Sequence, residues 1–207
     1  MNLRPFLAIS SAAILITVSA QPILASRDKA IETVQKSTQL FSSEMSAAKT
    51  RIPRSVLRNA LGIAIIPNVV KAGFIVGGTR GTGVLSVREP NGRWSNPAFL
   101  NLTAGSVGFQ VGAQSSDVII VFNSKASLQK ALTEDFDIGG NVSATAGPEG
   151  VTPVDNSSTI PDVYTYVRNR EGLFAGVSLQ GSKLGINSDR NRDFYNQPEI
   201  TTEKIFT

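Results

Sequence analysis

The sequence predicts an α+β fold that is mostly β, built on a strongly coiled antiparallel sheet that closes as a barrel or packs as a sandwich. Apolar residues recur at spacings of three and four over residues 27–50, whereas short runs of strand-forming residues fill most of the chain after residue 62. Many of these runs contain glycine, which inside strands marks bends, bulges or close backbone approach. We therefore expect N-terminal amphipathic helices, one helix between strands, and a strongly curved sheet.

The first 25 residues have the pattern of a secretory signal peptide. Arg4 supplies a positive charge, residues 6–18 form an apolar run, and Ala25 offers a small residue for cleavage. The apolar run is shorter than the ~20 residues that a membrane-spanning helix needs, which favours cleavage over anchoring. We therefore expect an exported protein, periplasmic or associated with the cell envelope.

After this segment the chain is expected to form one domain, residues 26–195. Its helical part is 26–61, its β-rich core is 62–195, and a poorly ordered tail follows at 196–207. A chain of this length buries a sizeable core without disulfides, and it has no cysteine. An exported chain without disulfides favours a bacterial periplasm over a eukaryotic secretory route.

The first expected helix covers residues 27–50. Its apolar face includes Phe41 and Met45, and charged and polar residues occupy the other face. The helix is expected to end before Pro53, because the residue that precedes proline avoids the helical region. This apolar face either packs on the sheet or inserts into a membrane, and the sequence leaves both open.

A second, short helix is expected from Pro53 to Leu61. Proline suits the first helical turn, and Gly62 is placed to act as the C-cap. Arg54 and Arg58 lie four residues apart and therefore share one face of this helix.

The β-rich core is expected to consist of short strands separated by turns. Tight turns are expected at Thr79-Arg80-Gly81 and Pro90-Asn91-Gly92. Ser124 is placed to cap a helix over 125–134, and Ser188 to cap a last helical turn that ends at Tyr195. The expected strands are 63–66, 72–78, 82–88, 99–103, 107–114, 117–122, 138–146, 163–168, 173–180 and 183–186.

One pattern occurs twice in the core. The segments 73–77 and 108–112 both read Gly-Phe-x-Val-Gly. We interpret them as two similar strands of one curved sheet.

The residue types offer little for catalysis. The chain has no histidine and no cysteine, which removes the commonest general base, the thiolate nucleophile and most zinc sites. The glycine-rich segment 77–83 lacks the Lys-Ser/Thr of a phosphate loop. Aromatic residues, Trp94 among them, are expected in the core, which argues against nucleic-acid binding. We therefore expect no catalytic residue, no metal site and no cofactor.

Charge is distributed unevenly along the chain. Residues 27–93 contain 11 Lys/Arg and 4 Asp/Glu, a balance of +7, whereas residues 94–207 contain 8 and 12, a balance of −4. A basic front half favours an anionic partner such as lipid headgroups, and the alternative is a dipolar surface without a partner.

A set of motifs after residue 50 is specific for one family. The motifs, in chain order, are Ile52-Pro53, Gly62-Ile63-Ala64-Ile65-Ile66-Pro67, Lys71-Ala72-Gly73-Phe74, Gly77-Gly78, Gly81-x-Gly83-Val84-Leu85, Trp94-Ser95-x-Pro97-Ala98-Phe99, Gly108-Phe109-Gln110-Val111-Gly112-Ala113-Gln114 and Gly172-Leu173-Phe174-Ala175-Gly176-Val177-Ser178-Leu179. Together they closely resemble the SYLF-domain family, also called the Las17-binding, actin-regulator-like family.

The resemblance implies lipid binding, since eukaryotic members bind phosphoinositides partly through an N-terminal amphipathic helix and nearby basic residues. Fungal members also bind actin, which an exported bacterial protein does not meet, so actin is not expected as a partner. The positions of this chain that match by region are Lys49, Arg51, Arg54, Arg58, Lys71, Phe41 and Met45. We therefore expect a non-catalytic module that binds anionic membrane lipids, and the alternative is a structural or assembly module that binds a protein partner through its sheet.

Overall fold

The computed structural model describes most of the chain after residue 20. The described residues are 21–46, 52–74, 76–107, 112–133, 136–138, 144–146, 161–169, 179 and 181–207. The helices are α1 (Gln21–Ser46), α2 (Arg54–Asn59), α3 (Lys125–Thr133), α4 (Ser188–Tyr195) and α5 (Thr202–Ile205). The strands are β1 (Gly62–Phe74), β2 (Val76–Val87), β3 (Ala98–Val107), β4 (Gly112–Phe122), β5 (Phe136–Ile138), β6 (Ala144–Ala146), β7 (Val163–Asn169) and β8 (Ser182–Ile186).

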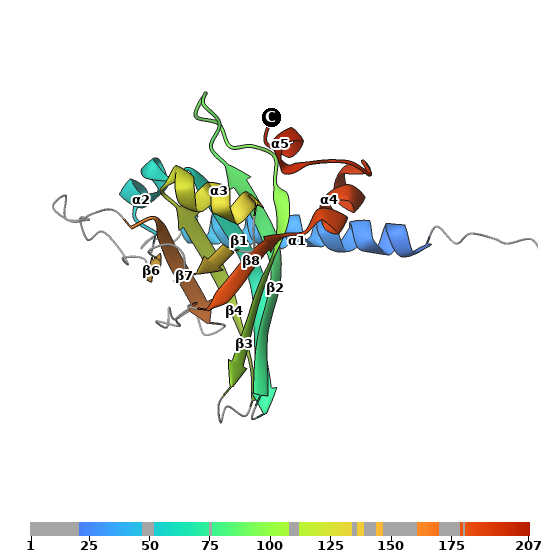
Figure 1. Ribbon diagram of the computed structural model, residues 1–207, viewed down its shortest axis with the longest axis vertical. Helices are drawn as coiled ribbons and strands as arrows, with labels where there is room; N and C mark the ends of the chain where they lie inside the picture. The colour runs from blue at the N-terminus through green and yellow to red at the C-terminus, as the bar shows by residue number, and fades with distance from the viewer. Residues whose placement is uncertain are drawn as a thin grey trace, which may run out of the picture.

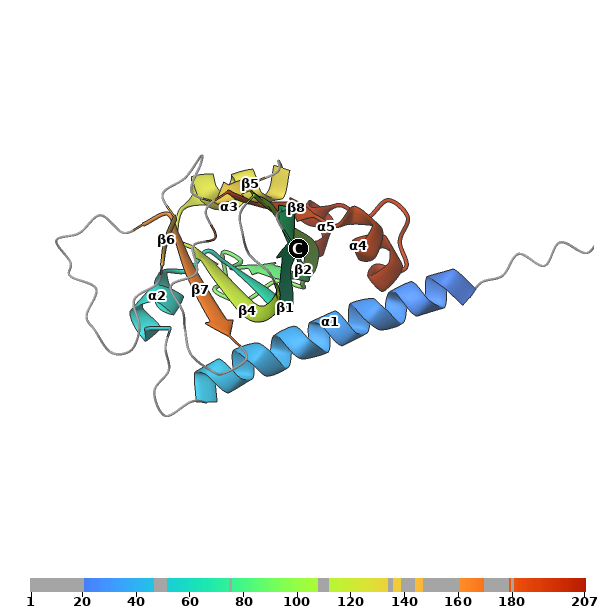
Figure 2. The same cartoon turned by 90° about the horizontal axis from the view of Figure 1, so that it is seen from below.

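All eight of these strands belong to one strongly curled sheet (Figure 1). Their order is β5-β8-β3-β2-β1-β4-β7-β6, and neighbouring strands are antiparallel except for the parallel pair β6 and β7. Helix α1 crosses the outer face of the sheet, and α3 lies on the opposite side (Figure 2). The expected α+β class and coiled antiparallel sheet are therefore confirmed, with one curled sheet in place of a two-sheet sandwich.

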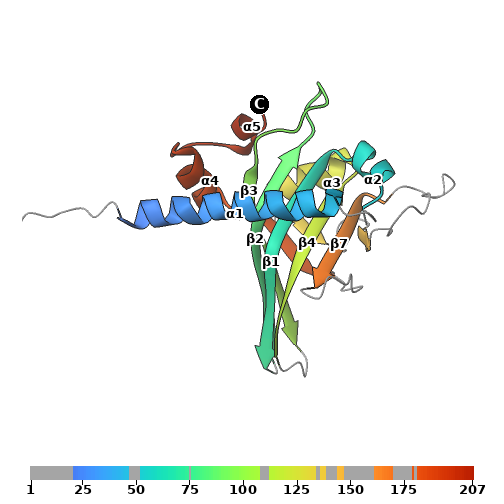
Figure 3. The same ribbon diagram turned by 180° about the vertical axis from the view of Figure 1, so that it is seen from behind.

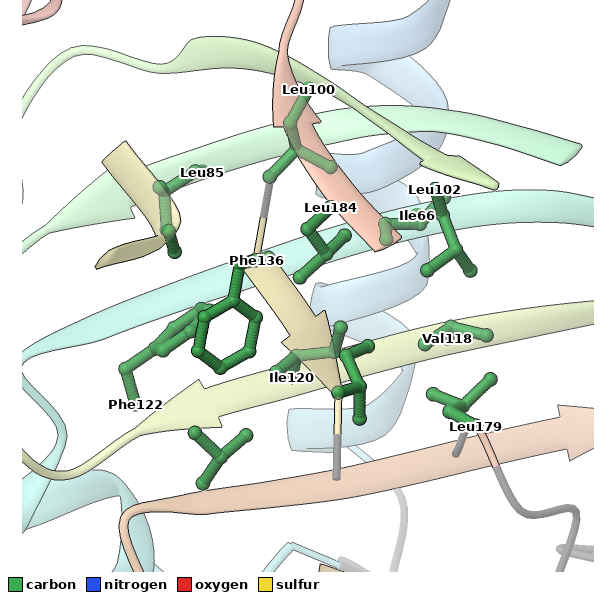
Figure 4. Close-up of a cluster of buried hydrophobic side chains, with 14 of the residues drawn as sticks. Ile66, Leu85, Leu100, Leu102, Val118, Ile120, Phe122, Phe136, Leu179 and Leu184 are labelled. Atoms are coloured by element: carbon green, nitrogen blue, oxygen red, sulfur yellow. The ribbon is translucent and has the colours of Figure 1, made fainter. Parts of the chain in front are cut away.

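The main core lies inside the curl. Phe122 and Phe136 are fully buried there, and their rings meet edge to face with centroids 5.7 Å apart. Aliphatic side chains from seven of the strands, all but β6, fill the space around them, and α3 adds Ala131 (Figure 4). Since side chains of strands far apart in the sequence meet here, this cluster holds the curled sheet together by apolar burial.

A second layer of core lies between the sheet and the two N-terminal helices. Leu40 of α1 and Val56 of α2 pack there against Ile63 of β1, Val121 of β4 and Tyr166 of β7. The expected amphipathic character of the first helix is thus confirmed, although the structure starts the helix at Gln21 and leaves residues 47–51 outside the described part.

Strand β1 corrects the prediction of two short strands. It runs without a break from Gly62 to Phe74, with a bulge at Pro67 and Asn68. Asn68 has a positive φ of 53°, and its backbone N–H donates to Asp117 Oδ1 across 3.1 Å. A bulge with an aspartate to accept its free N–H lets the strand continue past the proline.

The turn expected at Thr79-Arg80-Gly81 is wrong, because these residues lie inside β2. Thr79 pairs with Lys71 of β1 and Ala104 of β3, so the hairpin connection lies earlier in the chain, between Phe74 and Val76. The expected strand 107–114 is likewise divided, since β3 ends at Val107 and β4 begins at Gly112.

Helix α3 confirms a local prediction, since Ser127 N–H donates to Ser124 Oγ as an N-cap requires. Two other caps differ from the expected ones. Ala60 and not Gly62 is the C-cap of α2, and Asn187 and not Ser188 caps α4 through its side-chain oxygen. In α4 the side-chain Oδ1 of Asn187, one residue before Ser188, accepts the backbone N–H of Arg190 across 3.0 Å.

The C-terminal segment is also a correction, because residues 196–207 are not a tail. They contain α5, capped by Thr201, and Ile205 is 2% exposed while Phe206 packs against the main core. The described domain therefore continues to the last residue of the chain. The expected strand 173–180 lies outside the described residues except for Leu179, which is buried.

Burial of Tyr195 predicts a loss of stability in alkali. Its hydroxyl donates to the carbonyl of Pro97 across 2.8 Å, and burial raises its pKa from 10.0 to about 12. The folded state therefore keeps the neutral phenol, so this contribution is complete below pH 10 and is lost as the pH rises toward 12. Denaturant unfolding at pH 10 and at pH 12 measures the loss.

The variant Tyr195→Phe isolates this group. We expect a smaller difference between the two pH values in the variant, with part of it remaining because burial also raises the pKa of Tyr164 and Tyr166. An unchanged pH dependence in the variant contradicts the assignment to Tyr195.

Candidate functional site

Helix α2 presents two arginines to solvent. Apolar residues recur every four positions in this segment: Ile52, Val56 and Ala60 are at most 3% exposed. They therefore determine which face of residues 52–60 packs against the core. Arg54 and Arg58 therefore point away from the core, and both are exposed. Within the described part of the chain neither guanidinium forms an ion pair, so both charges are available to a ligand.

A third arginine holds the C-terminal end of this helix. Arg88, at the end of β2, donates from Nε to the carbonyl of Ala60 and from Nη2 to the carbonyl of Leu57, both across 2.9 Å. Carbonyls at a helix C-terminus lack partners within the helix, and a cation is favourable there. Arg88 thus ties α2 to the end of β2.

Trp94 lies against this arginine. The Arg88 guanidinium carbon is 4.6 Å from the centroid of the indole ring, and the two residues form an isolated antiparallel bridge. Trp94 is 40% exposed, which corrects its expected place in the core. We call Arg54, Arg58, Arg88 and Trp94 the α2–Trp94 surface.

Sequence reasoning identified two of these four residues. It missed Arg88 and Trp94, although the signal was present in the segment from Arg88 to Trp94, Arg-Glu-Pro-Asn-Gly-Arg-Trp. The turn at Gly92, with a φ of 83°, brings Arg88 and Trp94 opposite each other at the exposed end of a hairpin. Residues that flank a tight turn pair across the two strands, so the contact follows from the turn.

The structure separates Lys71 from Arg54 and Arg58 of α2. Lys71 is nine residues after Gly62 on the same strand, and an extended strand of that length spans about 30 Å. It pairs with Thr79 and Gln114 instead, beyond the helices. Lys49 and Arg51 lie outside the described residues.

Phe41 and Met45 lie on the core side of α1. Both are half-buried and pack against the cluster that contains Leu40, Ile119 and Tyr164. The sequence left two arrangements open for this face, packing on the sheet and insertion into a membrane. In the structure it packs on the sheet. Among the described residues no helix is both long enough and apolar enough to cross a membrane.

An ion-pair network fastens this end of α1. Glu44 is only 5% exposed, and its Oε1 is 2.8 Å from Nη1 of Arg168 on β7. The same guanidinium bonds Asp117 through Nη2 at 2.8 Å, and Asp117 also accepts the N–H of Asn68 at the bulge of β1. One arginine thus joins α1, β7 and β4.

The described residues contain no group of three or more side chains that could hold a metal ion. A cleft of about 440 Å³ lies where α3, β8 and the C-terminal helices meet, but none of its described lining residues is ionisable. Its polar side chains include Asn191, whose Oδ1 accepts the backbone N–H of Phe99 across 2.7 Å.

The sequence was compared with known proteins. The family model described as Las17-binding protein actin regulator matches residues 103–207. SH3 domain-containing YSC84-like protein 1 of Xenopus laevis is 37% identical over 160 residues, which cover 74% of this chain and 46% of that protein. The human protein of the same name is 38% identical over 152 residues, 70% of this chain and 43% of its own length. Protein YSC84 of Saccharomyces cerevisiae is 35% identical over 173 residues, 81% of this chain and 35% of its own length.

The chain spans less than half the length of these curated relatives. The family description names an actin regulator that binds Las17, a protein, so the expectation that actin is not a partner gains no support from it. The family model covers half of the chain, and the similarity to the relatives extends over more of it. This chain therefore belongs to the Las17-binding, actin-regulator family of SYLF domains.

Proposed function

We propose that this chain is a non-catalytic module that binds the anionic surface of a membrane through the α2–Trp94 surface. The observation that carries the proposal is the pair of exposed guanidiniums on α2, without an ion pair among the described residues, on a helix whose C-terminal carbonyls bond Arg88, which in turn stacks on the exposed Trp94. The N-terminal pattern of a signal peptide supports an exported location, so the membrane is one of the cell envelope.

The residue types of this surface suit a lipid headgroup layer. Each Lys or Arg near an anionic surface contributes about 1 kcal/mol of attraction, which falls off within a Debye length and weakens in salt. Tryptophan is enriched at the boundary between headgroups and acyl chains, where its ring is buried and its N–H stays hydrated. The surface binds without moving α1, whose apolar face stays on the sheet.

Removing the two charges of α2 is expected to weaken binding. The double variant Arg54→Gln/Arg58→Gln removes about 2 kcal/mol of attraction, and we expect the affinity for anionic vesicles to fall by roughly 30-fold at low salt. Co-sedimentation with phosphatidylglycerol-containing vesicles and with neutral vesicles, at low and high salt, measures this.

The matched control is Lys183→Gln/Lys204→Gln. It removes the same charge from two exposed residues on β8 and α5, away from α2, and binding is expected to change little. Equal losses in both double variants point to net charge alone and contradict a specific surface. No binding by the unsubstituted chain to any vesicle contradicts the lipid function and favours a protein partner, in line with the family description.

A further inference from the structure

The first turns of α1 dock on α4, near the other end of the chain. Figures 2 and 3 both show α4 beside the N-terminal half of α1. Ala30 of α1 is fully buried there, and Phe194 of α4 packs against the cluster that contains Ala30. Ser26 is half-buried, and its Oγ donates to Oδ2 of Asp193 on α4. The contact of α1 with α4 therefore includes Ser26, the first residue of the helix whose side chain the structure describes.

No described cation pairs with the half-buried carboxylate of Asp193. Two arginines lie on the same helix, but each has another partner. Arg192 pairs with Asp189, and Arg190 donates from Nη1 to Thr33 Oγ1 across 3.2 Å. Asp193 also lies in the last turn of α4, where the helix dipole disfavours a negative charge. A positive charge supplied by another element is therefore favourable at this position.

The pattern of the signal peptide places its cut immediately before Ser26. Ala25 is the small residue offered for cleavage, so the processed chain starts at Ser26 and carries an α-ammonium group there. In the unprocessed chain α1 begins at Gln21, and the nitrogen of Ser26 is an amide inside the helix. Cleavage therefore creates one new positive charge, at the residue that already bonds Asp193.

We propose that the processed N-terminus of the chain forms an ion pair with Asp193 that holds α1 on α4. The nitrogen of Ser26 is three covalent bonds from Oγ, so the ammonium lies within about 4–6 Å of the carboxylate, the range in which an opposite charge stabilises the charged form. The ion pair rests on the export that belongs to the proposed function, and it does not depend on lipid binding.

The new start of the helix also has side chains that suit an N-terminus. The cut removes the carbonyls that accept the N–H groups of residues 26–29, which become the free end of α1. Serine is a preferred N-cap residue, and Asp28 supplies a negative charge in the new first turn. Asp193 adds a second negative charge at this positive end of the helix dipole. The unprocessed helix has no acidic residue in its first turn.

The ion pair makes stability depend on pH through the ammonium. The α-amino group of an unfolded chain titrates at about 7.7–8.0. Asp193 raises this pKa in the folded chain, so the contribution is complete below about pH 7.7 and is lost as the pH rises through the folded-state value. The other charged residues of the two segments are Arg27, Asp28 and Lys29 on α1 and Asp189, Arg190 and Arg192 on α4. All of them are present whether or not the first 25 residues are removed.

The ion pair requires a chain that begins at Ser26. The full chain, residues 1–207, is produced in a bacterium that exports it, and the N-terminus of the recovered protein is sequenced. We expect Ser26 as the first residue. Any other first residue moves the ammonium away from Asp193 and overturns the ion pair, whereas vesicle binding by the α2–Trp94 surface does not depend on it.

The pH dependence of stability tests the ion pair itself. A chain that begins at Ser26 is compared with one that begins at Ala20, whose amino group is six residues, about 9 Å of helix, farther along α1. Between pH 7 and pH 9.5 we expect the unfolding equilibrium constant of the Ser26 chain to rise about fivefold more than that of the Ala20 chain, as the ammonium loses its proton. Urea unfolding measures this.

NMR titration of the α-amino group identifies the group that titrates. The helix dipole alone disfavours an ammonium at the N-terminus of α1 and therefore lowers its pKa. A pKa above about 8.0 in the Ser26 chain consequently reports the carboxylate of Asp193. A pKa at or below the range of an unfolded chain contradicts the ion pair.

Two variants of α4 complete the comparison. Asp193→Asn keeps an oxygen for Ser26 Oγ and removes the charge, so it is expected to abolish the extra pH dependence of the Ser26 chain. Asp189→Asn is the matched control on the same helix, with a side chain 81% exposed, and it is expected to keep that dependence. Retention of the dependence in Asp193→Asn, or equal losses in both variants, contradicts the ion pair. Asp193→Asn is expected to sediment with vesicles like the unsubstituted chain, so a failure of lipid binding and a failure of the ion pair are separate results.

Discussion

The Gly83→Ala variant is expected to lose about 3 kcal/mol or more of its free energy of unfolding, because overpacking against backbone has no flexible side chain to relieve it. A Cβ atom at Gly83 meets the carbonyl oxygen of Ile65 and lies 2.7 Å from the Cα atom of Ile66. These atoms precede the bulge of β1, where the two central strands approach closely. Urea denaturation followed by Trp94 emission measures the change.

Gly105→Ala is the matched control for this prediction. Gly105 lies in β3 of the same sheet, and a Cβ atom there has no neighbour within 4 Å among the described atoms. Replacing a strand glycine by alanine without strain lowers the entropy of the unfolded chain, so the control is expected to be neutral or slightly more stable. Equal losses in both variants attribute the effect to strand glycines in general and contradict a clash at Gly83.

Removal of the Arg168 charge is the second large effect that we expect. In Arg168→Met the stem remains while Glu44, 5% exposed, and Asp117 both lose their cation. Breaking a buried pair from one side costs 3–5 kcal/mol, and the Arg168 side chain is 29% exposed, so we expect about 3 kcal/mol. Chemical denaturation measures the loss, and limited proteolysis within α1 tests whether the helix is released.

Arg192→Met provides the comparison. Arg192 pairs with Asp189 at 2.6 Å, but both side chains are exposed, at 46% and 81%. Pairs of this kind contribute little, so a change below about 0.5 kcal/mol is expected. A similar small loss in Arg168→Met means that the network does not hold α1, and faster proteolysis in both variants argues against a specific release.

Local signals in the sequence predicted the elements that depend on local interactions. The helix α3 follows from Ser124 and the apolar spacing after it, and both the cap and the helix are present. That Arg54 and Arg58 share one face follows from their four-residue spacing on one short helix, and both are exposed. Such features need only a few neighbouring residues, which a sequence shows directly.

Features that depend on pairing between distant strands were not predictable in this way. Pro67 predicts the end of a strand. The strand continues because Asp117, 49 residues after Asn68, accepts the N–H of Asn68, and the sequence alone does not show this contact. Thr79-Arg80-Gly81 reads as a turn, since its glycine and polar residues suit one, yet β1 and β3 flank it on both sides. Because β1 is long, Lys71 lies far from α2, so Lys71 and the arginines of α2 do not form one site.

The contacts of α1 also have a consequence for how the protein is made. Three hydrogen bonds join the helix to segments far along the chain. Glu44 accepts from Arg168, 124 residues later, and Thr33 accepts from Arg190, 157 residues later. Ser26 donates to Asp193, 167 residues later. At about 5–20 residues per second, synthesis of the partner segments lags the helix by roughly 6–33 s. Helix α1 therefore leaves the ribosome well before the segments that it docks on, and during that interval its apolar face is open to chaperones and to any factor that recognises a nascent chain.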